Sequence, residues 1–184
     1  YAAADGRHAE EYEGADSHMI AEIGLALLWI AAALACLSLV AGTLFLRGGQ
    51  KDLAALVRPA SIAQGVLTAT AFGLLIALFV RSDMSVELVA RNSNSLKPMI
   101  FKVAGTWGNH EGSMLLWLTI LSLSGALIAL FEKRLREDTL IATLSAQAAL
   151  SLGFFAFLIF SSNPFNRLPV APPDGQGLNP LLQD

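Results

Sequence analysis

The chain has 184 residues, of which 54% are hydrophobic and only 15% are charged. Because the apolar residues form long blocks, this composition indicates a protein that lies in a lipid bilayer rather than a soluble domain. The net charge of −3 and the absence of a dense basic cluster argue against nucleic acid as a partner. The single cysteine, Cys36, excludes an internal disulfide and a paired-thiol metal or redox motif in this chain.

Residues 1–18 are polar and acidic, and they precede the first apolar run, which follows Met19. This composition predicts a disordered segment. We interpret the stretch as an upstream extension that is not native to the protein.

Four segments are long and apolar enough to cross a membrane, which takes about 20 mostly apolar residues for a hydrocarbon core of about 30 Å. They cover approximately residues 20–46, 60–80, 114–130 and 140–160. Glu22, at the outer margin of the first span, is the only charged residue in them. The sequence therefore predicts an all-α integral membrane protein with four transmembrane helices and a long loop, 81–113, between the second and third.

Proline and polar side chains inside these spans have structural interpretations. Pro59 suits the first turn of the second helix, where its missing N–H is not needed. The polar side chains are expected to bond across helices or back to backbone carbonyls; they are Ser38, Gln64, Thr68, Thr70, Ser145, Gln147 and Ser151.

Basic residues predict the orientation, because short cytoplasmic loops retain Lys and Arg. Loop 47–58 carries Arg47, Lys51 and Arg58, and loop 131–139 carries Lys133, Arg134 and Arg136. Both termini and loop 81–113 are therefore expected to face outward, which is the periplasm in a Gram-negative bacterium.

Loop 81–113 divides into three parts. Residues 84–94 show a patchy alternation that fits a short strand or an irregular surface segment. Residues 97–103 place two lysines beside bulky apolar groups, as in a helix that lies at the membrane interface. Residues 104–113, Ala-Gly-Thr-Trp-Gly-Asn-His-Glu-Gly-Ser, form the densest chemical cluster in the chain.

Within this last part, Trp107 fits an anchor at the headgroup level, and Glu111 or Ser113 could satisfy free N–H groups at the start of the third span. His110 is open to two interpretations. An outward imidazole beside a carboxylate can ligate a metal or haem iron, or it can have a structural or supporting role. No second histidine is nearby in sequence, since His8 and His18 lie in the suspected extension, so we favour the supporting role.

Residues 161–184 contain Pro and Gly at a spacing that forbids a regular helix, and we expect an extended outward segment that leads into a further domain.

Five short motifs, in this order along the chain, resemble the sequence motifs of one protein family. They are Ala21-Glu-Ile-Gly24, Val89-Ala-Arg-Asn-Ser-Asn94, Thr106-Trp-Gly-Asn-His-Glu-Gly-Ser-Met-Leu-Leu-Trp117, Ser161-Ser-Asn-Pro-Phe165 and Leu178-Asn-Pro-Leu-Leu-Gln-Asp184. The family they resemble is CcmF, the haem lyase subunit of the cytochrome c maturation system. The resemblance implies a bacterial inner-membrane protein, of which this chain is the N-terminal quarter to third.

The same resemblance implies a function. Together with other maturation subunits and a haem chaperone, the whole protein would attach haem to the Cys-x-x-Cys-His thiols of an apocytochrome c at the outer face of the membrane. The resemblance also implies that the haem ligands lie beyond Asp184. We therefore expect a platform that supports haem without binding iron, built from Trp107, Gly108, Asn109, His110, Glu111 and Gly112, with no catalytic or metal-ligating residue in this chain.

A membrane transporter or proton-translocating subunit is the alternative from another class. Such proteins usually place ionisable residues inside their spans. Only Glu22 is of this kind here, which disfavours that alternative.

Overall fold

The computed structural model describes residues 2–49 and 51–176, with side chains described from Met19 onward. Over these ranges the chain forms helices and no named strand: α1 (Ala2–Leu46), α2 (Lys51–Arg81), α3 (Glu87–Asn92), α4 (Met99–Gly105), α5 (His110–Phe131) and α6 (Glu137–Phe160). Among them, 4 helices are long and apolar enough to cross a membrane. The predicted all-α fold with four spans is confirmed.

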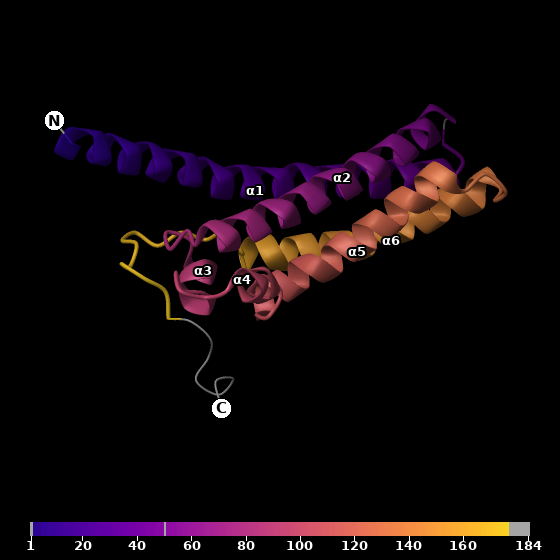
Figure 1. Cartoon of the computed structure of the whole chain (residues 1–184). Helices are drawn as coiled ribbons and strands as arrows, with labels where there is room; N and C mark the ends of the chain where they lie inside the picture. The colour runs from indigo at the N-terminus through magenta and orange to yellow at the C-terminus, as the bar shows by residue number, and fades with distance from the viewer. Residues whose placement is uncertain (1, 50, 177–184) are drawn as a thin grey trace.

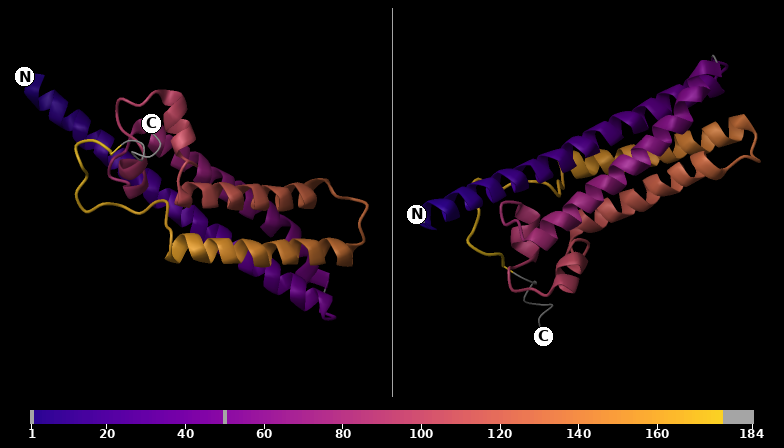
Figure 2. Two further views of the ribbon diagram at one scale, coloured as in Figure 1. Left: turned by 90° about the horizontal axis from the view of Figure 1, so that it is seen from below. Right: turned by 45° about the horizontal axis from the view of Figure 1, so that its top comes forward.

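The four long helices lie side by side and alternate in direction (Figure 1). The short connections α1–α2 and α5–α6 lie at one end of the bundle, whereas α3, α4 and the segment after α6 gather at the other, which we call the loop end. α1 packs chiefly on α2 and α6, and α2 packs on α5 (Figure 2). The long loop and the C-terminal segment therefore meet at the loop end, although about 50 residues of sequence containing α5 and α6 separate them.

Two helix boundaries differ from those expected from the sequence. α1 begins at Ala2, so residues 2–18 continue the first helix where we expected disorder. Extending an existing helix adds a hydrogen bond per residue without a new nucleation step, and this stretch is rich in the helix formers Ala and Glu.

α2 begins at Lys51, so Pro59 lies inside the helix rather than in its first turn. The turns before Pro59 are held by apolar packing, since Ala54 and Val57 belong to a core cluster and Leu53 packs against it.

Arg58 consequently lies in α2 and not in a loop as expected. Its guanidinium donates to the carbonyls of Ala129 and Glu132, at 3.2 and 3.3 Å, and so satisfies the C-terminal end of α5. A cation there also complements the negative end of the helix dipole.

The connection after α5 is ordered by Glu132. Its carboxylate accepts hydrogen bonds from the backbone N–H groups of Arg134 and Leu135, and these hydrogen bonds lower the pKa of Glu132.

The helices approach closely where residues are small. A Cβ on Gly65 would meet Ala126 and the Ser122 carbonyl of α5, and beside it Gln64 donates to the Ser122 hydroxyl at 3.1 Å. Gln147 of α6 donates to the Leu121 carbonyl. Hydrogen bonds across helices and back to carbonyls, as expected for polar residues in spans, are thus formed by Gln64, Thr68, Thr70, Ser145 and Gln147. The expectation is wrong for Ser38 and Ser151, whose buried hydroxyls have no hydrogen-bond partner.

The first part of loop 81–113 is helical, not a strand. α3 buries Leu88, Val89 and Ala90 against the bundle, and strand-like pairing within the described ranges is limited to a single bridge between Val86 and Arg167. The expectation of a short strand or irregular segment is therefore wrong for residues 87–92. The patchy apolar pattern could not show that three consecutive apolar residues would all find a buried environment.

Candidate functional site: a polar pocket at the loop end

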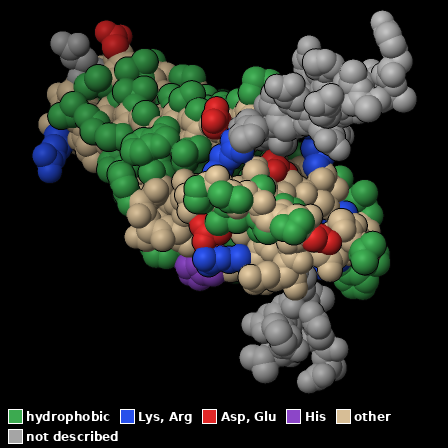
Figure 3. Space-filling model, turned by 90° about the vertical axis from the view of Figure 1, so that its left-hand side faces the viewer, with side chains coloured by type: hydrophobic (Ala, Val, Ile, Leu, Met, Phe, Trp, Pro, Cys, Tyr) green, Lys and Arg blue, Asp and Glu red, His purple; other side chains and the backbone are tan. Residues whose placement is uncertain are grey.

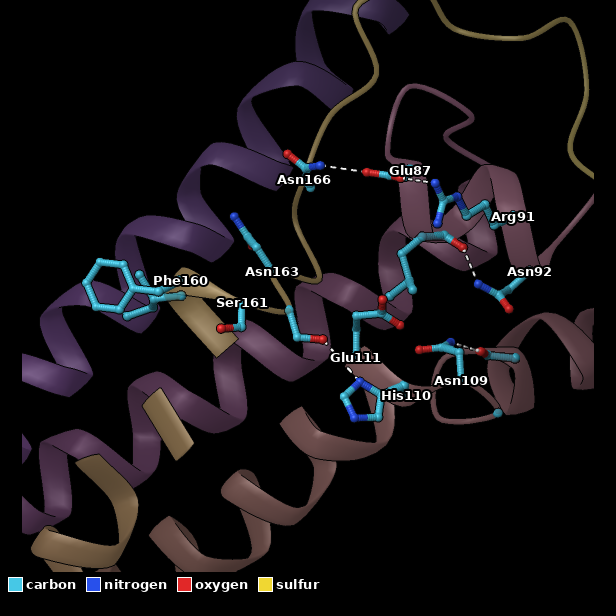
Figure 4. Close-up of a pocket in the computed structure, with 15 residues that line it drawn as sticks. Glu87, Arg91, Asn92, Asn109, His110, Glu111, Phe160, Ser161, Asn163 and Asn166 are labelled. Carbon is cyan, nitrogen blue, oxygen red and sulfur yellow. Dashed lines mark hydrogen bonds and ion pairs between the residues drawn. The ribbon is translucent and has the colours of Figure 1, made fainter. Parts of the chain in front are cut away.

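A pocket of about 780 Å³ opens at the loop end, between α3, the start of α5 and the end of α6 (Figure 4). Its size is in the range of small-molecule sites. The lining residues come from four stretches of sequence: Glu87, Leu88, Arg91 and Asn92; Gly105; Gly108, Asn109, His110 and Glu111; and Ile159, Phe160, Ser161, Ser162, Asn163 and Asn166. In the space-filling view of this end, charges of both signs lie among polar surface, next to a strongly apolar flank (Figure 3).

Asn109 fixes the turn from α4 into α5. Its side-chain oxygen accepts from the Gly112 N–H at 2.7 Å, which makes it the N-cap of α5. Its amide nitrogen donates to the carbonyls of Gly105 and Thr106, at 2.8 and 3.3 Å. One side chain thus satisfies groups on both helices. We expected Glu111 or Ser113 in this capping role, and this was wrong because α5 begins at His110, so both residues lie inside the helix.

Gly112 permits the tight contact at this turn. A Cβ there would lie 1.6 Å from the Thr106 carbonyl oxygen and 3.0 Å from Asn109 Oδ1. Any larger residue would push α5 away from the preceding loop. Gly112 is thus required by packing, and it is buried and not one of the lining residues of the pocket.

His110 is the first residue of α5, and its ring is held by one residue of α6, Phe157, and by Ser162 just after that helix. Nδ1 lies 3.1 Å from the Ser162 hydroxyl. The ring also meets Phe157 edge to face, with centroids 5.6 Å apart and planes at 77°. The exposed imidazole therefore has one nitrogen engaged and a defined orientation (Figure 4).

The opposite wall is a network around Glu87. Its carboxylate pairs with Arg91 at 2.5 Å, one helical turn on, and accepts from the Asn166 side chain at 2.6 Å. The Glu87 backbone N–H donates to the Asn166 carbonyl at 2.9 Å. These contacts join α3 to the segment after α6, and both charges of the wall are thereby compensated.

The segment after α6 is fastened along its length. Phe165 is buried against Gly24 of α1, and Arg167 reaches Ser85 at 3.1 Å and Glu22 at 3.9 Å. Further on, the Asp174 carboxylate accepts from the backbone N–H and hydroxyl of Ser95, at 2.9 and 2.8 Å. Residues 161–176 are therefore a structural part of the loop end. The last residues of the expected segment, 177–184, lie outside the described residues.

Of the six residues expected at the site, Gly108, Asn109, His110 and Glu111 line the pocket, whereas Trp107 and Gly112 do not. Trp107 is 41% exposed. The sequence did not reveal the roles of Glu87, Arg91, Ser162, Asn163 and Asn166. Arg91, Ser162 and Asn163 lie within sequence motifs that resemble one family, whereas Glu87 and Asn166 lie outside those motifs.

The pocket does not fit iron or haem as a resident group. In the part of the chain that the structure describes, no three His, Cys, Asp or Glu residues converge to hold a metal ion. The lining offers one imidazole, and its other groups are mainly amides, hydroxyls and paired charges. A haem macrocycle needs broad apolar faces and an axial ligand. The residues here can orient and support neighbouring groups through hydrogen bonds.

Comparisons with known proteins agree with this architecture. Residues 107–184 match the family model described as cytochrome C assembly protein. The chain is 46% identical over 169 residues to the cytochrome c-type biogenesis protein ccl1 of Rhodobacter capsulatus, covering 90% of this chain and 25% of that protein. It is 45% identical over 170 residues to the cytochrome c-type biogenesis protein CcmF of Pseudomonas aeruginosa, with the same coverage.

A solved structure titled Cytochrome c Heme Lyase CcmF has the same fold. It superposes with a TM-score of 0.75 at 24% sequence identity, covering 80% of this chain and 25% of the solved chain. The chain thus spans about a quarter of the length of the curated relatives that it matches.

Proposed function

Because this chain belongs to the CcmF family of cytochrome c-type biogenesis proteins, we propose that it is the part of a haem lyase that supports haem transfer to apocytochrome c. In this proposal the complete protein, in the bacterial inner membrane, receives haem from a haem chaperone. It then presents the haem to the Cys-x-x-Cys-His thiols of the apocytochrome, together with other maturation subunits.

The observation that carries the proposal is the pocket that the Trp-Gly-Asn-His-Glu-Gly word builds at one end of the bundle. Asn109 locks the turn between α4 and α5, and the His110 ring is oriented by Ser162 and Phe157. This arrangement holds the polar groups of the pocket in defined positions. It supports a platform role for the four residues of this stretch that line the pocket, Gly108, Asn109, His110 and Glu111, and the proposal places the haem ligands outside this chain.

The proposed orientation places the loop end in the periplasm. It is supported by the basic residues around the opposite end: Arg47, Lys51, Lys133, Arg134 and Arg136. A phosphatase or fluorescent reporter fused after Leu135 tests it. Cytoplasmic reporter behaviour is expected, and periplasmic behaviour would contradict the orientation.

Transport or proton translocation has no comparable support. In the first span, Glu22 is 73% exposed and lies 3.9 Å from Arg167. In the second span, Arg58 donates to the Ala129 and Glu132 carbonyls at the C-terminal end of α5. A surface ion pair at a helix margin does not provide a relay through the bilayer.

The experiment is His110→Ala in the full-length protein, with Ser162→Ala as the matched variant that only releases the ring. Haem per polypeptide is measured from the Soret and α bands, and cytochrome c yield is measured in cells. A supporting role predicts that His110→Ala keeps its bound haem while cytochrome c yield falls, and that Ser162→Ala shows a smaller fall. If His110→Ala loses haem as completely as a variant without an iron ligand, His110 is itself a ligand and the supporting role is wrong.

A further inference from the structure

Helix α4 and Leu96, in the turn that precedes it, expose a set of large apolar side chains, which we call the α4 patch. It consists of Leu96, Met99, Ile100 and Phe101, which are 88%, 57%, 73% and 55% exposed. No residue of α4 is buried. This exposure is high for side chains in a polar loop region, and such a patch marks a contact with another apolar phase or surface.

The position of α4 along the bundle defines what this phase is. The apolar run of α2 ends at Val80, directly before the exposed Arg81. Lys102 of α4 donates to the Ser82 hydroxyl at 2.6 Å, and Gly105 lies against the Phe79 ring. α4 is therefore level with the last turn of α2, where the hydrocarbon core gives way to the headgroup region.

We infer that the α4 patch lies in the headgroup region of the bilayer and anchors the loop end to the membrane surface. This inference concerns a surface outside the pocket and is independent of the haem-handling role. Its occupant is lipid, because the exposed side chains are apolar and α4 lies level with the end of the apolar run of α2.

The charges beside the patch fit this occupant. Lys97 donates to the Asn92 carbonyl at 2.8 Å, and Lys102 donates to Ser82, so both amines turn from the patch towards the polar loop. An apolar turn flanked by lysines that reach the polar side is the arrangement of an interfacial helix.

The size of the patch argues against a second copy of this chain. A stable protein interface buries about 800 Å² on each partner. Leu96 and three side chains of the short helix α4 present less area than that. Insertion into the bilayer requires no minimum buried area, since the transfer of each apolar side chain out of water is favourable by itself.

The anchor also has a consequence for the pocket. Gly105 ends α4 and lines the pocket, and the Asn109 side chain bonds to the Gly105 and Thr106 carbonyls. The depth of α4 in the interface therefore sets the height of the pocket floor above the membrane. The pocket lies next to the headgroups rather than far out in the aqueous phase.

The test measures the depth of Ile100 in the full-length protein, reconstituted in nanodiscs of phosphatidylethanolamine and phosphatidylglycerol. A fluorophore is attached to Ile100→Cys in a background in which the native cysteines, including Cys36, are replaced by serine. Quenching is compared between lipids carrying a nitroxide on the headgroup and lipids carrying it at carbon 12 of the acyl chain. Matched labels are placed at Leu150 and Val66, which are 63% and 56% exposed within the spans, and at Val170, which is 80% exposed beyond α6.

We expect the headgroup nitroxide to quench the Ile100 label several-fold more than the acyl-chain nitroxide, and the order to be reversed at Leu150 or Val66. The Val170 label should respond mainly to aqueous iodide. Two results would overturn the inference. If the Ile100 label behaves like the Val170 label, the patch is in water. If it is shielded from both lipid quenchers and from iodide, protein covers it.

Discussion

Gly24 of α1 lies directly under the ring of Phe165, so that a Cβ at position 24 would be 2.4 Å from Phe165 Cε1. Phe165 itself is almost completely buried and belongs to the main core cluster. This contact joins the beginning of the first span to the segment that follows the last one. The motifs 21–24 and 161–165, which contain these two residues, are therefore parts of one packed unit.

Gly24→Ala should therefore destabilise the protein. Because an aromatic ring on the opposing segment cannot retreat without moving the core, overpacking of this kind typically costs about 1–3 kcal/mol. Thermal unfolding of the full-length protein in detergent measures the effect. Gly153→Ala is the control, since nothing lies within 4 Å of a Cβ there, and equal midpoints for the two variants would contradict the close contact.

Asn109→Ala should loosen the turn that shapes the pocket. The change removes the N-cap acceptor for Gly112 and the donors to Gly105 and Thr106, and loss of a cap alone costs about 0.5–2 kcal/mol. Hydrogen–deuterium exchange of peptides covering 105–116 should accelerate. Asn109→Asp keeps an acceptor for the Gly112 N–H but has no donor, so its exchange should be intermediate; unchanged exchange in Asn109→Ala would show that the cap is dispensable.

Arg58→Ala should weaken the opposite end of the bundle. The substitution leaves the Ala129 and Glu132 carbonyls without a charged donor, and a partly buried cation at a helix C-terminus contributes up to about 2 kcal/mol. Chemical denaturation should show a lower stability than that of Arg47→Ala, since Arg47 is an exposed residue in the α1–α2 connection. Equal losses would mean that general positive charge, rather than this capping contact, matters at this end.

The attachment of the C-terminal segment should depend on acid pH. The backbone N–H of Ser95, together with its hydroxyl and the N–H of Gly175, lowers the pKa of Asp174 below the usual 3.8. A carboxyl group with a lowered folded-state pKa stabilises the fold above its unfolded pKa, and this contribution is lost as pH falls through the folded pKa. The contact between residues 174 and 95 should thus weaken below about pH 3.8.

The mobility of a spin label at Val170, four residues before Asp174, reports this change. In the wild-type background the label should gain mobility through that acidic window. Asp174→Asn should give a mobile label already at neutral pH, with little further response to acid. A label that remains immobile in Asp174→Asn would show that the other contacts, such as the Gln176 N–H to the Ala90 carbonyl, hold the segment by themselves.

The candidate site was predictable only in part. The window 107–112 was identified because glycines, an indole, an imidazole and a carboxylate stand together in sequence, and four of its residues line the pocket. Glu87 and Asn166, which build the other wall, are far from this window and from each other in sequence. Their hydrogen bond at 2.6 Å arises from the way the bundle brings its loop-end segments together, and no local pattern specifies it.

The sequence by itself determined the number of spans and the all-helical class, because long apolar runs in a bilayer have no other means of satisfying their backbone hydrogen bonds. Tertiary structure decided the rest. It made α3 a helix by burying Leu88, Val89 and Ala90, and it made Asn109 the cap by starting α5 at His110. It also placed Ser162 against the imidazole. These outcomes depend on which surfaces meet when the helices pack, and hydrophobic periodicity along one segment carries no information about its distant partners.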